Sequence, residues 1–177
     1  DALDRLSIEA RDGRLVIGQR KFAGDEDRRA ARGVVTIRIN AAGLRAATMG
    51  GAGSLQIDRL KGTRVIIGLR GPGTLSVGRI DADRLSVAMI GNGTMTLGGT
   101  VKQAQMTLSG AGMFDAGALA VDALTFDGEG AGDHVLRAVK TAAVTARGVG
   151  KTIVLGRPVC TVRNVGNGSV QCGPVKR

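Results

Sequence analysis

Residues 148–152, Gly-Val-Gly-Lys-Thr, resemble part of a nucleotide-phosphate loop, in which glycines precede Lys-Thr. The complete motif requires Gly, four residues and then Gly-Lys-Ser/Thr. Its first glycine would stand at position 145, which is Thr145. A helix should also follow, because the N–H groups of its first turn bind the phosphate. Here Ile153-Val154-Leu155 follows, which is typical of a strand, so the segment does not predict nucleotide binding.

Two other segments carry side chains that could act as catalysts or metal ligands. His134 is the only histidine, and without a second basic or thiol partner it does not predict a triad or a metal cluster. We expect it in the core or at a strand end. Segment 127–133 resembles a calcium loop, but Ala131 and Ala138 occupy positions that require an oxygen ligand and a Glu. We therefore predict no catalytic residue, no cofactor and no metal.

Three carboxylates could serve a carbohydrate-active enzyme, which needs paired acids on one face. Asp58, Asp81 and Asp83 lie between strand-like segments and could share a side of the molecule. Nothing in their spacing singles them out. A groove lined by these acids and by arginines would favour the enzyme interpretation, and a flat polar face would count against it.

The two cysteines, Cys160 and Cys172, lie close together near the end of the chain. In an exported protein an even pair indicates a disulfide, and in a cytosolic protein two free thiols. We predict a disulfide. The alternative is a buried thiol at Cys172, which falls at an apolar position of the repeat.

Charge favours acidic partners, since the chain carries a net charge of +10 and has a pI of about 11.0. We expect an anionic polysaccharide, a lipopolysaccharide or an envelope surface. Arg28, Arg29 and Arg32 form the densest cationic cluster and could contact an anion or lie in a solvated loop. Specific nucleic-acid binding is not expected, because there is no Trp or Tyr for base stacking and no recognised DNA-binding pattern.

Most of the chain is a repeat of 18–20 residues, marked by seven Gly-x-Gly pairs. Their first glycines are 20, 20, 19, 20, 18 and 18 residues apart. The pairs are Gly51/Gly53, Gly71/Gly73, Gly91/Gly93, Gly110/Gly112, Gly130/Gly132, Gly148/Gly150 and Gly166/Gly168. Such regular spacing indicates a stacked architecture.

Apolar positions recur within each unit. Four residues after the first glycine stand Leu55, Leu75, Met95, Phe114, His134, Thr152 and Val170, and six after it Ile57, Val77, Leu97, Ala116, Leu136, Val154 and Cys172. The residues between them are mostly polar, which predicts a strand with one buried face. A third inward column is expected at Leu60, Ile80, Leu119, Val139 and Val175, followed by a second strand.

Such a unit buries its apolar face only by stacking on its neighbours. We therefore predict an all-β fold, a right-handed parallel β-helix of about seven coils; parallel crossovers are nearly always right-handed. Each Gly-x-Gly would form the corner before the first strand. Glycine allows positive φ there, and the missing Cβ avoids the coils above and below.

Residues 1–50 differ from the repeat. Segment 6–18 alternates on both sides of Asp12-Gly13, which predicts a β-hairpin. We interpret 1–50 as an antiparallel cap and 51–177 as the coils of one continuous domain. No apolar run approaches the roughly 18 residues that span a bilayer, so no transmembrane segment is expected. Because the chain begins at Asp1 without Met, we expect a removed signal peptide.

The segments "GGAGSLQIDRL", "RGPGTLSVGRIDADRLSVAMIGNGTMTLGG" and "LSGAGMFDAGAL" resemble the head GIN domain, also called the putative auto-transporter adhesin family. The hallmark of that family is a repeated small-Gly-x-Gly-x-apolar-x-apolar unit, and the resemblance covers essentially the whole chain. It implies a right-handed β-helix in an exported bacterial protein, periplasmic or attached to the envelope or outer surface. It implies no catalytic residues.

Three functions follow from these observations. The first is a non-enzymatic, exported envelope protein that serves adhesion, binding or structure and contacts anionic surface polymers. The second is a carbohydrate-active β-helix enzyme of lyase or hydrolase type. The third is a self-assembling structural rod, a homo-oligomer that light scattering would distinguish from a monomer.

Overall fold

The computed structural model describes residues 6–11, 14–19 and 43–174 of the chain. The chain divides into two compact units, Asp1–Ala41 and Ala42–Arg177. In the first unit β1 (Leu6–Arg11) pairs antiparallel with β2 (Arg14–Gln19), which confirms the hairpin predicted for segment 6–18. The capping role of the first unit stays a prediction, but residues 46–50, included in the predicted antiparallel cap, pair in parallel within the second unit.

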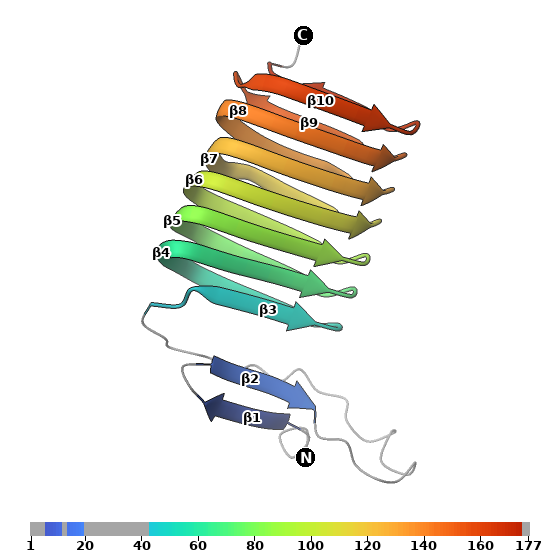
Figure 1. Cartoon of the computed structure of the whole chain (residues 1–177). Helices are drawn as coiled ribbons and strands as arrows, with labels where there is room; N and C mark the ends of the chain where they lie inside the picture. The colour runs from blue at the N-terminus through green and yellow to red at the C-terminus, as the bar shows by residue number, and fades with distance from the viewer. Residues whose placement is uncertain (1–5, 12–13, 20–42, 175–177) are drawn as a thin grey trace. The chain divides into compact units, whose positions relative to one another are not determined.

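The second unit is a solenoid of about seven turns, made of parallel strands (Figure 1). The strands are β3 (Ala46–Gly50), β4 (Ser54–Arg70), β5 (Thr74–Ile90), β6 (Thr94–Gly110), β7 (Met113–Gly130), β8 (His134–Gly148), β9 (Lys151–Gly156), β10 (Val159–Val165) and β11 (Ser169–Cys172). Each pairs in parallel with the equivalent part of the next coil, from β3 to β11, and β10 pairs with β8. The predicted parallel β-helix is confirmed, and the described residues contain no helix.

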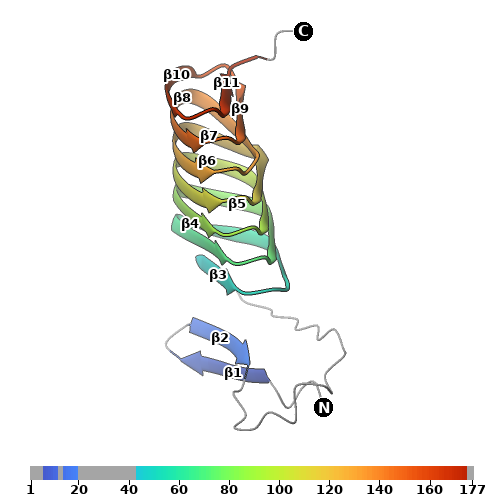
Figure 2. The ribbon, with the colours of Figure 1, turned by 90° about the vertical axis from the view of Figure 1, so that its right-hand side faces the viewer.

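The long strands bend within each coil. In β4, Asp58 and Arg59 are both exposed, and so are Thr63 and Arg64, which interrupts the alternation of buried and exposed residues. Two successive outward side chains require a turn of the strand, because side chains otherwise alternate between faces. Each coil therefore has a first wall, residues 54–57 in β4, and a second wall, residues 64–70. Figure 2 shows the walls stacked, with β11 above β9 and β10 above β8.

Aliphatic side chains fill the space between the walls. Residues in register on successive coils, such as Leu75, Met95 and Phe114, form columns of buried side chains along the axis. Phe114 and Phe126 are the largest of the fully buried residues. The in–out alternation expected from the repeat thus produces one continuous apolar core, in which each coil covers the next.

The two glycines of a corner have different roles. Gly91 has φ +114°, a conformation that side-chain-bearing residues rarely adopt. Gly93 has no positive φ, but a Cβ there would lie 2.6 Å from the carbonyl oxygen of Gly73 in the previous coil. The first glycine is therefore required by backbone conformation, and the second by the close approach of two coils. From Gly110 onward the close approach excludes a Cβ on the first glycine as well.

Gly53 departs from the corner role predicted for it. A Cβ there would lie 3.3 Å from Cε of Met49, and no backbone atom of another coil among the described residues comes within 4 Å. The expected clash with a neighbouring coil is therefore wrong at Gly53. The reason is its place in the first corner, because the Cβ of a second glycine points toward the preceding corner. Gly53 is instead required by its φ of +136°, unlike Gly93.

Gly112, like Gly93, has the role of a second glycine in its corner. Positive φ was expected at the corners, but Gly112 has none, so its backbone conformation does not require glycine. A Cβ there would first overlap Cε of the buried Met89, a core side chain, and would lie 2.5 Å from the carbonyl oxygen of Gly93. The expected close approach of coils is thus present at Gly112, and the side chain of Met89 also occupies the space that a Cβ would need.

One expected core position is wrong. Val139 was expected in the third inward column, but its side chain is 50% exposed, whereas Ala138 is fully buried. The cause is the short unit that begins at Gly130: Val121 of β7 pairs with Ala138 of β8, and Ala123 with Thr141. Shortening the bend moves Ala138 into the inward position and turns Val139 toward solvent. Val175 lies outside the described residues.

Candidate functional site

The segment that resembles a phosphate loop is a corner followed by a strand. Gly148 has φ +136°, and Lys151 begins β9 rather than a helix. Thr152 is buried at 2% exposure in the inward column, where its hydroxyl cannot reach a phosphate in solvent. The backbone N–H of Lys151 donates to Oδ1 of Asp133 at 3.1 Å. The segment therefore lacks the helix N-terminus that phosphate binding requires.

His134 lies in the core, as expected. It is 8% exposed, and its ring centroid lies 5.3 Å from that of Phe126. Its Nδ1 atom is buried and has no hydrogen-bond partner. Burial lowers the pKa of His134, and the nearby Asp133 opposes that shift only in part. The ring is thus a buried member of a largely apolar column, in which the neutral form is favoured.

Two of the three acids considered for an enzyme, Asp81 and Asp83, are held in ion pairs between coils, whereas Asp58 is exposed and has no cationic partner among the described residues. Asp81 lies 3.5 Å from Arg59 and 4.0 Å from Lys61, and Asp83 lies 2.8 Å from Lys102. The Asp83 carboxylate raises the pKa of Lys102. These exposed pairs join successive coils at the bends, where ion pairs contribute little because solvent screens them. The concave surface of the second wall is lined by other residues, so the geometry does not favour the enzyme.

Two carboxylates of the acidic segment 127–133 make contacts with the next coil. Asp127 pairs with Arg147 of the next coil at 3.5 Å, and Asp133 accepts the bond from Lys151. Across the described ranges, no three His, Cys, Asp or Glu side chains come close enough together to hold a metal ion. Arg28, Arg29 and Arg32, the expected anion contacts, lie outside the described residues.

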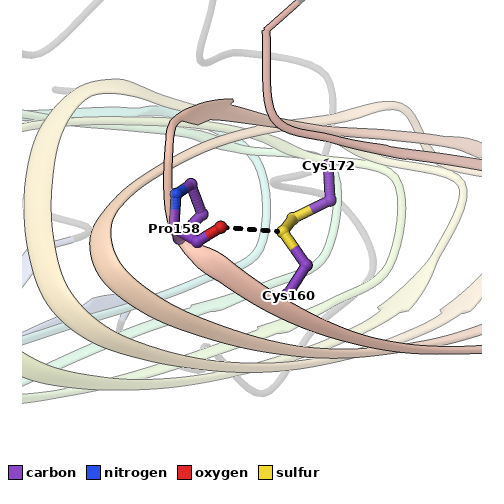
Figure 3. The surroundings of a disulfide bond; sticks show 3 residues. All are labelled: Pro158, Cys160 and Cys172. Atoms are coloured by element: carbon purple, nitrogen blue, oxygen red, sulfur yellow. Dashed lines mark hydrogen bonds between the residues drawn. A yellow bond between two sulfur atoms is a disulfide. The ribbon is translucent and has the colours of Figure 1, made fainter.

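Cys160 and Cys172 are joined by a disulfide across the last coil (Figure 3). Cys160 is in register with the buried Ala142 of the second wall, and Cys172 with the buried Val154 of the first. The bond therefore connects the walls through the interior. The Cys160 sulfur also lies 3.6 Å from the carbonyl oxygen of Pro158. Because a disulfide sulfur carries no proton, that approach is a packing contact.

A concave polar surface lies on the second wall, spanning β4 to β7, with a volume of about 400 Å³. We call it the arginine–glutamine groove and define it by six side chains, Arg64, Arg84, Ser86, Gln103, Gln105 and Thr125. Small side chains such as Ala123 also line it. The groove offers guanidinium, amide and hydroxyl groups but no aromatic ring.

Register places the groove side chains in two columns along the axis. Arg64, Arg84 and Gln103 occupy the same position on three successive coils, about 4.8 Å apart. Ser86, Gln105 and Thr125 form the neighbouring column. The strands thus present hydrogen-bonding groups at the spacing of the coils.

The two arginines are adjacent like charges. Among the described residues the cations in ion pairs are Arg59, Lys61, Lys102, Lys140 and Arg147, and neither Arg64 nor Arg84 pairs with a carboxylate. Like charges directly opposite on neighbouring strands are destabilising. An anion bound between these guanidinium groups would remove that repulsion, which makes this end of the groove a candidate anion site.

Sequence reasoning did not identify the groove. A signal is present, because Arg64 and Arg84 each stand thirteen residues after the first glycine of their unit, Gly51 and Gly71. Gln103 stands twelve after Gly91, in a unit one residue shorter. Only the observed register places the three in one column.

No helix long and apolar enough to cross a membrane occurs in the part of the chain that the structure describes. No curated protein matches the sequence.

The solved structures that resemble the chain include two from Parabacteroides species. A putative lipid binding protein from Parabacteroides distasonis is 20% identical, with a TM-score of 0.68, and the match covers 97% of this chain and 80% of that one. A putative adhesin from Parabacteroides merdae is 16% identical, with a TM-score of 0.69, and the match covers 96% of this chain and 78% of that one. At these identities the likeness concerns the fold.

A family model matches residues 1–158, which include the hairpin and the corners up to Gly150. The corners and the alternating strands of the solenoid are the features on which the resemblance was based. The chain belongs to the family described as "Putative auto-transporter adhesin, head GIN domain".

Proposed function

We propose that this protein is a non-enzymatic binding module, exported to the cell envelope or outer surface, that holds an anionic surface polymer in the arginine–glutamine groove. The observation that carries the proposal is the pair Arg64 and Arg84, stacked on neighbouring coils without a carboxylate partner among the described residues. Family membership supports a binding role, and the net charge of +10 supports an acidic ligand.

The geometry suits binding better than catalysis. The groove presents donors and hydroxyl groups, and its six defining side chains include no carboxylate that could act as acid or base. Guanidinium groups bind carboxylate and phosphate through paired hydrogen bonds, which gives affinity without a reaction.

The test measures binding of polygalacturonate, a uniformly acidic polysaccharide, with uncharged dextran as the negative control. Replacing both arginines (R64Q/R84Q) should weaken binding about tenfold or more, because each charged hydrogen bond contributes about 1.5–3 kcal/mol. Binding should also weaken as salt rises, since exposed charges are screened.

The variant R157Q/R163Q is the matched control. It removes the same number of charges from exposed positions at the C-terminal end of the solenoid, away from the groove. Its affinity should stay within about threefold of the parent. Equal losses in both variants would show that only the net charge matters, and a failure of every acidic glycan to bind would refute the proposal.

A further inference from the structure

We infer that the ligand of the arginine–glutamine groove is a glycan whose charge lies at one end, bound along the solenoid axis with its acidic sugar at Arg64 and Arg84. This inference rests on the proposed function and specifies its ligand class. It follows from the order of side chains along the groove, which changes from cationic to neutral over three coils.

The cationic end is confined to the first two coils of the groove. Arg64 belongs to β4 and Arg84 to β5, and the next residue in their column is the neutral Gln103 of β6. A uniformly acidic polymer would gain charge-assisted hydrogen bonds only over these two coils. Beyond them its carboxylates would meet amides and hydroxyl groups.

Carboxylates flank the far end. Asp122 and Asp127 lie on β7 beside the groove residues Ala123 and Thr125. Both are at least partly exposed, and each has a single cationic partner among the described residues, Lys140 and Arg147 respectively. Because each acid is paired with a cation, this end offers an anionic group no unpaired positive charge, whereas a neutral sugar needs none.

The neutral part of the groove matches sugar hydroxyl groups. Gln103 and Gln105 each carry an amide that both donates and accepts, and Ser86 and Thr125 add hydroxyl groups. These groups lie in two neighbouring columns on successive coils, so a linear chain along the axis would meet new partners at every coil. A chain running across the axis would leave the groove after one coil.

The experiment uses three short oligosaccharides of equal length: a neutral one, the same one oxidised at its reducing end to an aldonate, and an oligogalacturonate. Isothermal titration with the full chain should give the highest affinity for the aldonate. The variant Q103A/Q105A should weaken aldonate binding about tenfold, because it removes two neutral hydrogen-bonding side chains. It should leave binding of gluconate, the acidic group alone, unchanged.

Controls separate this inference from the proposed function. Gln56→Ala changes an exposed glutamine of the first wall and should not affect any of the ligands. R64Q/R84Q should remove the preference for the aldonate over the neutral sugar. If oligogalacturonate binds best and Q103A/Q105A has no effect, the one-ended ligand is refuted while the proposed function stands. If no acidic sugar binds, both are refuted.

Discussion

His134 places an ionisable ring in a column that otherwise holds apolar and small side chains. In register with it are Phe114 on one side and Thr152 on the other, and Phe126 packs against the ring. A charged imidazolium would be buried there without an anion in hydrogen-bonding contact with Nδ1. The stability of the neighbouring coils is therefore linked to the protonation of a single residue.

We expect the free energy of unfolding to fall as the pH falls below about 6.5. The pKa of His134 is lowered in the folded protein from its ordinary value of 6.5, so the unfolded chain binds the proton more tightly. This contribution to stability is complete at pH values above the pKa that His134 has in the unfolded chain. It is lost as the pH falls toward the lower pKa that His134 has in the folded protein. Denaturant unfolding at a series of pH values measures the slope.

The variant His134→Leu keeps an apolar side chain in the column and removes the titration. Its unfolding free energy should change less than that of the parent between about pH 7 and pH 5. If parent and variant show the same pH dependence, another group is responsible and the account of His134 is wrong.

At the scale of the element, the corner is the part of the coil with the least tolerance for change. Gly93→Ala should destabilise the solenoid by about 2 kcal/mol or more, because its Cβ would overlap the carbonyl oxygens of Gly73 and Gly71. Gly91→Ala should lower the free energy of unfolding by about 1–2 kcal/mol, because alanine rarely adopts the positive φ of this position. Thermal or denaturant unfolding of each variant measures these costs.

Gly50→Ala provides the control for the corner variants. Gly50 precedes the first corner, has no positive φ and would place a Cβ with nothing within 4 Å. Its substitution should change stability by less than about 0.5 kcal/mol. A Gly93→Ala variant as stable as Gly50→Ala would show that the coils can move apart at no cost, contrary to the close packing of the corners.

The strands show how far sequence reasoning reaches. The repeat predicted the coils and most inward columns, because an inward position is constrained by the same packing in every unit. It failed at Val139, where a shortened unit changes which residue points inward, and at Gly53, where no earlier corner lies against the glycine among the described residues. It also missed Arg64 and Arg84, because outward side chains carry no periodic constraint and their alignment depends on register.

At the scale of the whole solenoid, stability should decrease toward the C-terminal end. In a stack of coils each rung is stabilised by its neighbours, so a terminal rung receives support from one side only. Val162 of β10 is 43% exposed, although its register partner Val144 is 2% exposed. The central coils β5 to β7 hold many fully buried side chains, including Phe114 and Phe126.

The disulfide offsets this loss of packing in the last coil. Cys160 and Cys172 are twelve residues apart in sequence, and closing a loop of that size contributes about 3 kcal/mol by restricting the unfolded chain. The bond also joins β10 of the second wall to β11 of the first, where few side chains hold the walls together.

Hydrogen exchange before and after reduction tests whether the C-terminal coil depends on that bond. Intact mass with and without reductant and alkylation first establishes the oxidation state. In the oxidised protein we expect the slowest exchange in β5 to β7 and faster exchange in β9 to β11.

Reduction, or the double variant C160S/C172S, should speed exchange in β9 to β11 and leave β4 to β6 unchanged, because coils interact only with their neighbours. Faster exchange along the entire solenoid would instead mean that the coils unfold as one cooperative unit, in which case the C-terminal bond would stabilise even the distant groove.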